Sequence, residues 1–370
     1  MFKKKEKDPG FFTLDAIKEK NATYNIIYGE RSNGKSYACL KEILTKYCTT
    51  GEEGAIIRRW AEDFKGKRGN SIFAPLVKNN VVYELTNGNW DGVYYYSGRW
   101  FLCKQDGNDK VIKDDKPFCY AFSFTDMEHD KSTSYPNITT IVFDEFLTRK
   151  VYLPDEFVLF MNTLSTIIRY RDNVTIYMLG NTVNQYCPYF KEMGLSHVRN
   201  QKKGTIDLYT YGDSELTVAV QYADSPVKEK KSDKYFAFDN PKLKMITSGA
   251  WEIALYPHCP VNYKPKDIKF MFFIKFEDDL LQCEVVMFDR YNFLYIHRKT
   301  TELKHPEKDL IFDTEYSAAY NYGRRITNPV NKIQQKISWY FAADKVFYQD
   351  NEVGEIVRNY VNWSKTTRIE

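Results

Sequence analysis

The amino-acid sequence predicts an α/β domain with a central, mostly parallel sheet, followed by a linker and a smaller α+β domain. Three observations support this fold class. Short apolar runs alternate with helical periodicity in the first half of the chain, a glycine-rich turn joins the first run to the first helix, and the composition becomes polar and basic near residue 200. We therefore expect domains at 1–200 and 241–370, with a linker at 201–240.

Composition and charge exclude several classes of protein. At about 150 residues per domain, the 370 residues predict two domains. The 43% apolar and 16% aromatic content excludes disorder, and no apolar run has the length of a membrane-spanning helix or the position of a secretory leader. The net charge of +4 leaves nucleic-acid binding to local basic patches. Seven scattered Cys and five His without paired spacing predict neither a disulfide framework nor a metal site built by the protein.

Four apolar runs are expected to form buried strands. Their residues are apolar almost without interruption, which is typical of parallel strands that are covered on both faces. Between residues 81 and 124, aromatic and β-branched residues predict an antiparallel elaboration at the sheet edge, in which VVYEL (81–85) is a strand and Ser97-Gly98 is a turn. The four runs are 24–28, 55–59, 140–144 and 174–179.

Two helices are predicted to flank this sheet. The first starts at the glycine-rich turn and runs over 35–47, and the second starts near Pro154-Asp155 and ends beside Arg169. The apolar face of the second helix is expected to consist of Phe157, Met161, Leu164 and Ile168.

The second half of the chain predicts strands first and helices after. Its polar start includes VKEKKSDK (227–234), which is typical of an exposed linker. Three strands with short loops then predict an antiparallel meander, and helical patterns follow it. The expected strands are 267–276, 281–289 and 293–299, and the expected helices are 315–322, 330–343 and 353–363.

The most informative motif is YGERSNGKSYA, which fits G-x-x-x-x-G-K-[ST] after an apolar strand and before a helix. Glycines let backbone N–H groups converge on phosphates, Lys35 can reach the terminal phosphates, and the Ser36 hydroxyl can ligate Mg²⁺. The alternative is an ordinary strand-to-helix turn. The residues expected to contact a nucleotide are Gly29, Glu30, Arg31, Ser32, Asn33, Gly34, Lys35, Ser36 and Tyr37.

A second motif, TTIVFDEF, ends an apolar run with two carboxylates, at the strand edge where open α/β sheets bind ligands. We expect Asp144, with Ser36, to hold Mg²⁺ and Glu145 to polarise an attacking water. The alternative is an acidic helix cap after a strand. The next strand ends in Asn181, which we expect to contact the γ-phosphate or the water unless it is simply a turn residue.

Basic residues supply two further sets of candidates. Hydrolysis of a triphosphate calls for a guanidinium near the γ-phosphate, supplied in cis or by a neighbouring subunit, although helix ends and strand ends also attract arginines. Lys65, Lys67 and Arg68 are candidates for sequence-independent contacts with DNA phosphates, as are Lys202-Lys203 and 228–231, although such runs are more often merely solubilising. The arginine candidates are Arg31, Arg58, Arg59, Arg169 and Arg171.

These motifs, together with IIRRW, DKSTSYPNITTIVFDEF, TIIRYRDNV and LGNTVNQYCPYF, resemble the DNA-packaging ATPases (encapsidation proteins) of the small Picovirinae podophages over most of residues 20–195. The resemblance implies an ASCE-type P-loop ATPase that uses ATP and Mg²⁺. It also implies a ring, expected to be a pentamer, that translocates double-stranded DNA through the portal into an empty prohead in the host cytoplasm. It leaves open whether a packaging RNA takes part.

The resemblance also suggests roles for individual residues. Lys35 and Glu145 are similar to the catalytic lysine and base, and Arg31 is similar to an arginine inside the phosphate loop. Arg169 is similar in position to an arginine finger that acts in trans, Lys131 is similar to a basic residue that reaches the neighbour's nucleotide, and Arg58 is a further trans-acting candidate.

The resemblance suggests an RNase H-like C-terminal domain. Such nucleases need a carboxylate in the middle of the first strand to hold two metal ions, but in DIKFMFFIKF the charged interior residues are Lys269 and Lys275. We therefore predict a degenerate domain without nuclease activity. Two alternatives remain open: a terminase whose nuclease is active, with carboxylates from 277–279, and a nucleotide-binding module without turnover.

Overall fold

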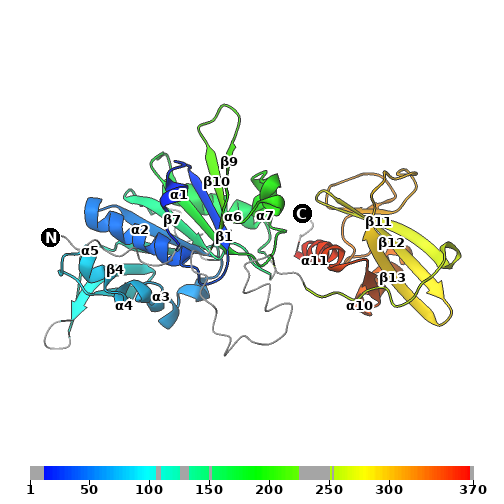
Figure 1. Cartoon of the computed structure of the whole chain (residues 1–370), viewed down its shortest axis with the longest axis horizontal. Coiled ribbons are helices and arrows are strands. Elements are labelled where there is room, and N and C mark those ends of the chain that lie inside the picture. Colours follow the sequence, from blue (N-terminus) through cyan, green and yellow to red (C-terminus); the bar gives the residue numbers. More distant parts are fainter. Residues whose placement is uncertain are drawn as a thin grey trace. The chain divides into compact units, whose positions relative to one another are not determined.

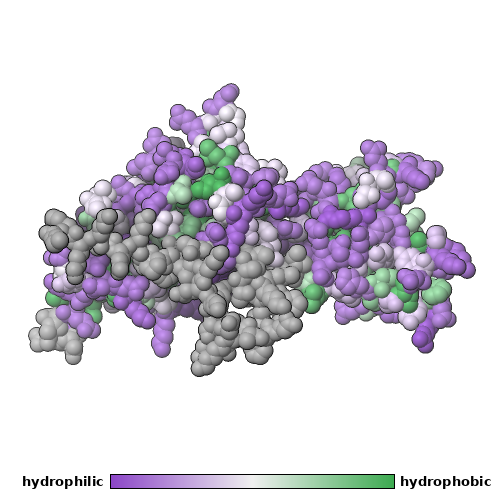
Figure 2. All heavy atoms as spheres, viewed as in Figure 1, coloured by the Kyte–Doolittle hydropathy of each residue, from purple (hydrophilic) through white to green (hydrophobic). Residues whose placement is uncertain are grey.

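The computed structural model describes residues 12–105, 110–125, 133–149, 152–224, 251 and 254–366. The chain forms two compact units, of which the first comprises 1–149 and 155–251 and the second 150–154 and 252–370 (Figure 1). In the described part of the chain, no helix combines the length and the apolar character needed to cross a membrane. On the face seen in Figure 2, hydrophilic side chains cover most of the described surface of each unit.

The first unit is a single large sheet flanked by helices. Its described helices are α1 (Asp15–Lys18), α2 (Lys35–Thr50), α3 (Lys67–Ser71), α4 (Ala74–Lys78), α5 (Val81–Leu85), α6 (Glu156–Ile168) and α7 (Pro188–Glu192). Its described strands are β1 (Tyr24–Gly29), β2 (Glu53–Arg58), β3 (Gly92–Tyr96), β4 (Arg99–Gln105), β5 (Val111–Lys113), β6 (Cys119–Ser123), β7 (Ile138–Asp144), β8 (Thr175–Asn181), β9 (Ile206–Thr210) and β10 (Thr217–Ala223).

The strand order of this sheet confirms the predicted mostly parallel architecture. Among the described residues the order is β3-β4-β6-β2-β7-β8-β1-β10-β9, with β5 paired to β4. The six strands from β6 to β10 are mutually parallel, and β8 lies between β1 and β7. The strand before the glycine-rich turn and the strand that carries the acidic pair are therefore separated by one additional strand, as expected of an ASCE-type sheet.

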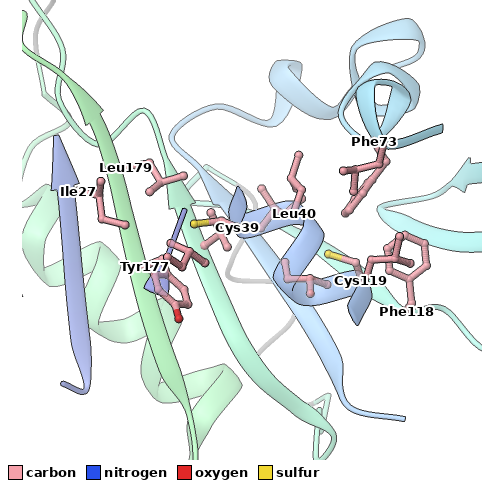
Figure 3. Packing of buried hydrophobic residues seen from close by; sticks show 14 of the residues in the cluster. Ile27, Cys39, Leu40, Phe73, Phe118, Cys119, Tyr177 and Leu179 are labelled. Atoms are coloured by element: carbon pink, nitrogen blue, oxygen red, sulfur yellow. The ribbon is translucent and has the colours of Figure 1, made fainter. Parts of the chain in front are cut away.

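Helices cover both faces of the central strands, which explains why these strands are apolar along their whole length. On β7, Val142 belongs to the core cluster that includes Cys39 and Leu40 of α2 (Figure 3). The next residue, Phe143, points to the opposite face, where its ring stacks on Phe160 of α6 at 5.1 Å and meets Tyr189 of α7 edge-on at 5.6 Å. Alternate residues of β7 thus pack against different helices.

Three predictions for the first unit are corrected by the structure. VVYEL forms α5, because Val81 and Val82 pack into the α2 core instead of pairing with a strand. On α6 the buried residues include Phe160, Leu164 and Ile167, whereas Met161 is 39% exposed, because the buried Glu156 fixes the rotation of the helix from its first turn.

The predicted linker also starts too early. Residues expected at 201–240 include β9 and β10, which complete the sheet beside β1. The polar alternation of β9 is typical of an edge strand, and this polarity explains why the segment resembles a linker in composition. The segment VKEKKSDK lies outside the described residues.

The second unit is a mixed sheet with two longer helices. Among the described residues the sheet order is β15-β14-β11-β12-β13-β16, with the predicted antiparallel meander in its centre and parallel strands on either side. The strands and helices of this unit confirm its predicted α+β character, and its likeness to RNase H stays a prediction. The elements are β11 (Ile268–Phe276), β12 (Asp279–Phe288), β13 (Tyr291–Arg298), β14 (Ile311–Asp313), β15 (Tyr322–Gly323), α10 (Lys332–Ala342), β16 (Val346–Tyr348) and α11 (Asn351–Thr366).

The helix predicted at 315–322 is wrong. This segment is a loop that leads into β15, with Tyr316 and Tyr320 80% and 86% exposed. The side-chain amide of Asn321 donates to the carbonyls of Pro306 and Asp309 at 2.8 and 2.7 Å, which satisfies backbone groups of the neighbouring loop instead of a helix.

Candidate active site

The glycine-rich turn between β1 and α2 is the segment predicted to bind phosphate, and we call its residues 29–36 the phosphate loop. Position 29 must be glycine, because a Cβ there would lie 2.6 Å from the carbonyl oxygen of Ala223. Gly34 is the N-cap of α2 with φ of 96°, a left-handed conformation that favours glycine. The loop therefore brings backbone N–H groups and the N-terminus of a sixteen-residue helix to one point, which is an arrangement that binds anions.

Lys35 lies folded against this loop. Its Nζ donates to the carbonyl oxygen of Glu30 at 2.6 Å and to Asn33 Oδ1 at 3.0 Å, and the residue is 5% exposed. Burial lowers the pKa of Lys35 to about 8, although the carboxylates of Asp144 and Glu30 oppose this shift. The ammonium group is thus held at the loop by acceptors that a phosphate oxygen can replace.

Asp144 at the end of β7 meets the phosphate loop directly. Ser36 Oγ donates to Asp144 Oδ1 at 3.1 Å, and Arg58 Nη2 donates to Asp144 Oδ2 at 2.7 Å. A hydroxyl and a carboxylate at this spacing are oxygen ligands of the kind that Mg²⁺ prefers when substrate phosphates supply the others. No cluster of three or more His, Cys, Asp or Glu suited to a metal occurs in the described ranges. Binding of Mg²⁺ by Ser36 and Asp144 stays a prediction.

Glu145 follows in a left-handed backbone conformation with φ of 64° and an exposed side chain. Its carbonyl oxygen accepts a hydrogen bond from Arg59 Nη1 at 3.3 Å, and the next carbonyl, of Phe146, accepts from Arg59 Nη2 at 3.0 Å. The same guanidinium pairs with Glu156 at 2.7 and 2.6 Å through two nitrogens. A buried arginine therefore fixes the backbone that carries the predicted base.

These groups surround one cavity of about 550 Å³. The carboxyl ends of β2, β7 and β8 contribute to its wall. The register of β8 with β1 places Asn181 opposite Gly29, at the start of the phosphate loop. Ser71, Ile72 and Pro75, from the end of α3 to the start of α4, form another side of the cavity. The residues of the cavity wall that carry the expected chemistry are Asn33, Lys35, Ser36, Arg58, Arg68, Asp144, Glu145 and Asn181.

Comparison with known proteins agrees with this geometry. A profile of the podovirus DNA encapsidation protein (Gp16) family matches residues 8–313. This chain belongs to that family. The DNA packaging proteins of Bacillus phages B103 and phi29 are each 30% identical to it, over 174 and 169 residues. These matches cover 46% and 45% of this chain and 48% and 45% of the relatives, so the chain spans about half the length of the curated relatives it matches.

Two solved structures share the fold of this Gp16-family chain. They are the Phi-28 gp11 DNA packaging motor and the bacteriophage phi29 viral genome packaging motor assembly. Each comparison covers 97% of this chain and 99% of the other, with a TM-score of 0.54. The sequence identities are 17% and 19%, so these comparisons show a common fold.

Of the other predicted nucleotide-binding and trans-acting residues in the described ranges, Ser32, Gly34, Tyr37 and Arg58 line the cavity and the rest do not. Arg31 is exposed on the phosphate loop, and Tyr37 lies at the start of α2. Arg169 is the C-cap of α6 and is exposed, with Nη2 donating to the carbonyl of Thr133 at 2.9 Å. Arg58, predicted as a trans-acting candidate, contacts Asp144 of its own chain. Lys131 lies outside the described residues.

Lys65, Lys67 and Arg68, the DNA-binding candidates of this segment, make different contacts. Lys65 is exposed and pairs with Glu62 at 3.0 Å, and Lys67 is exposed at the start of α3. Arg68 lines the cavity and donates to the carbonyl of Glu62 at 3.1 Å. Contact with DNA remains a prediction for all three.

Sequence reasoning missed the partner of Arg59. Glu156 is 2% exposed and also accepts a hydrogen bond from the Tyr189 hydroxyl at 2.9 Å. The only available signal was an acidic residue directly after Pro154-Asp155 at the start of an apolar helix, which is also the usual pattern of a solvated N-terminal turn. Nothing in the sequence pairs it with a residue 97 positions away.

Proposed function

We propose that this chain is the ATP-hydrolysing subunit of a ring that drives double-stranded DNA into an empty prohead. The observation that carries the proposal is the convergence of Lys35, Ser36, Asp144 and Glu145 on one cavity at the carboxyl edge of a parallel sheet. The names of the family and of its relatives supply the packaging context. We further propose that the ring contacts the portal and acts in the host cytoplasm.

The residues of the cavity divide the chemistry among them. The loop N–H groups and Lys35 would bind the β- and γ-phosphates, and Ser36 and Asp144 would hold Mg²⁺, which neutralises phosphate charge when bound. Glu145 accepts a proton from the attacking water, and Asn181 is placed to orient that water or the γ-phosphate. Arg58 adds positive charge beside Asp144, within the same subunit.

A second cavity of about 600 Å³ adjoins the first and is suited to the nucleobase. Gly34, Tyr37 and Pro75 line both cavities. Phe12 and Leu14 provide apolar walls, as expected for a flat heterocyclic ring. A nucleotide with its phosphates on the loop would therefore extend past Tyr37 with its base in this second cavity.

Tripolyphosphate separates the roles of the two cavities, because it has no base. Thr13→Trp fills the second cavity from an exposed position and should weaken ATP binding while leaving competition by tripolyphosphate unchanged. If ATP and tripolyphosphate lose affinity equally, the second cavity does not bind the nucleobase. Thr13→Leu and Thr13→Met introduce smaller side chains than tryptophan and should weaken ATP binding less.

The ring itself is inferred from Arg169. This arginine is exposed at the end of α6, and a finger that completes the site of the next subunit requires a head-to-tail assembly, which closes into a ring. A pentamer is proposed from the resemblance. ATP and ADP would then favour different conformations of the subunit, and the change between them would move DNA-binding loops along the backbone of the duplex.

The second unit favours packaging without cleavage. Lys275 of β11 lies in register with Asp313 of β14, and their Nζ and Oδ2 atoms are 3.2 Å apart. Lys275 lies near the end of β11, whose middle residue is the fully buried Phe272. The middle of this strand therefore lacks the carboxylate that an active RNase H-like nuclease would offer for metal. Absence of Mn²⁺-dependent plasmid nicking is the expected result, and nicking that is lost when residues 277–279 are neutralised would favour the terminase alternative.

The decisive experiment measures phosphate release by the purified protein with ATP and Mg²⁺, alone and with DNA and empty proheads. We expect hydrolysis that DNA and proheads accelerate together, with DNA stimulation that falls steeply with salt and is independent of sequence. ATP binding without hydrolysis under all conditions would support the module without turnover and refute the motor.

A further inference from the structure

Two carboxylates lie side by side at the mouth of the phosphate loop. Strands β1 and β10 are parallel neighbours in which Gly29 is opposite Ala223. Glu30 follows Gly29 and Asp224 follows Ala223, so the register brings both acidic residues to the same edge of the sheet. Gly29 packs so closely against the Ala223 carbonyl that a Cβ would lie 2.6 Å from its oxygen, so the two strand ends lie close together. Like charges in this arrangement repel each other unless a cation lies between them.

Lys203 is that cation. Its Nζ lies 2.6 Å from Glu30 Oε1 and 3.2 Å from Asp224 Oδ1. The Glu30 side chain is 12% exposed and that of Lys203 is 32% exposed, so solvent screens this contact less than it screens an ordinary surface pair. Lys202-Lys203 was a sequence candidate for contact with DNA, which stays a prediction, and the structure adds the contact of Lys203 with the phosphate loop.

The backbone around Lys203 is held in place independently of its side chain. Gly204 N donates to the Tyr222 carbonyl at 2.7 Å, and Tyr222 N donates to the Thr205 carbonyl at 3.1 Å. These bonds fix the turn before β9 to the end of β10. The lysine side chain is therefore presented to Glu30 by the sheet edge and does not depend on a long flexible loop.

The charge of Glu30 matters because of where this residue lies. Its carbonyl oxygen accepts a hydrogen bond from Lys35 Nζ at 2.6 Å, and its carboxylate acts electrostatically on Lys35. A loop that binds a polyphosphate depends on positive potential from N–H groups and lysine, and an uncompensated carboxylate one residue into the loop would reduce that potential.

We propose that Lys203 is a positioning residue of the nucleotide site, which neutralises Glu30 and fastens the start of the phosphate loop to the end of β10. The proposal rests on the proposed function in one respect, since it assumes that the loop binds a nucleotide triphosphate. It links the start of the phosphate loop to the end of β10, the last strand of this sheet in chain order.

A double-mutant cycle on the full chain tests the proposal. The dissociation constant of ATP with Mg²⁺ is measured at low salt for wild type, Lys203→Met, Glu30→Gln and the double variant, with Lys202→Met as the matched control because that lysine is exposed and adjacent. We expect Lys203→Met to weaken ATP binding about two- to fivefold, an effect that shrinks at high salt. Lys203→Arg should restore the affinity, and Lys203→Met should raise KM with little change in kcat.

The double-mutant cycle distinguishes a role of Lys203 at the nucleotide site from a role in the stability of the fold alone. Lys203→Met should weaken binding little when Glu30 is already Gln; an equal loss in both backgrounds, or the same loss in Lys202→Met, overturns the proposal. Amide hydrogen exchange of residues 30–36 in the protein without nucleotide provides a separate readout, and we expect faster exchange in Lys203→Met. If wild type binds no nucleotide, the proposed function fails, whereas unchanged exchange overturns the positioning role itself.

Discussion

Ser36 Oγ donates a hydrogen bond to Asp144 Oδ1 at 3.1 Å across 108 positions of sequence. This contact joins the end of the phosphate loop to the end of β7, on opposite sides of the additional strand β8. Two motifs that are separate in sequence thus share one cavity, and a metal ion bound there would contact both. A site of this kind predicts which substitutions remove hydrolysis and which remove binding.

Glu145→Gln should abolish hydrolysis while ATP remains bound. The amide keeps the size of the side chain but cannot accept a proton from water, which typically costs 10²- to 10⁴-fold in rate. The measurement is phosphate release under saturating ATP together with the dissociation constant of ATP. Glu192→Gln on the exposed end of α7 is the matched control. Hydrolysis that survives Glu145→Gln would remove the assignment of the base.

The sheet and the core of the site could be predicted from sequence because both depend on local patterns. Uninterrupted apolar runs indicate buried parallel strands, and the residues of the phosphate loop follow one another directly in the sequence. VVYEL was interpreted as a strand because a five-residue segment rich in β-branched and aromatic residues does not distinguish a strand from a short helix whose position is set by packing. The ion pairs of Glu156 and Lys203 were not predicted because a charge paired across the fold has the same local sequence pattern as a solvated one.

The affinity for ATP should fall as the pH rises through about 8. Burial lowers the pKa of Lys35 from 10.5 to about 8, so its ammonium form, which attracts phosphate, predominates only below that pH. Above it, binding must take up a proton, and the dissociation constant should rise by up to about tenfold per pH unit. Titration calorimetry between pH 7 and 9.5 measures this slope. Lys35→Arg stays charged and should flatten it, and a pH-independent affinity of wild type would contradict the prediction.

Breaking the buried pair of Arg59 and Glu156 should destabilise the first unit. Their side chains are 8% and 0% exposed, so Arg59→Met leaves a buried carboxylate without its cation and should lower the free energy of unfolding by about 3–5 kcal/mol. The variant Arg59→Met/Glu156→Leu should lose less, because no buried charge remains. Denaturant unfolding followed by fluorescence compares wild type, Arg59→Met, Glu156→Leu and the double variant. A double variant as unstable as the sum of the single variants would show that the two residues act separately.

Arg58 and Arg169 should differ in whether a neighbouring subunit can supply them. Arg58 pairs with Asp144 of its own chain, whereas Arg169 is exposed at the end of α6. Arg58→Ala, Arg169→Ala and Glu145→Gln are each expected to be nearly inactive in the assembled motor with DNA and proheads. Mixing Arg169→Ala with Glu145→Gln should restore hydrolysis, because a subunit with an intact base then borrows the arginine of its neighbour. At equal proportions about one quarter of the interfaces in a head-to-tail ring become complete.

Mixing Arg58→Ala with Glu145→Gln should restore nothing, since no subunit then has both its own arginine and its own base. The two mixtures control for each other, because both contain the same Glu145→Gln protein and assemble in the same way. Restoration in both mixtures would make Arg58 a trans-acting residue, as its sequence position first suggested. Restoration in neither would show that α6 does not present Arg169 to the next subunit, and the inference of a ring built on that contact would fall.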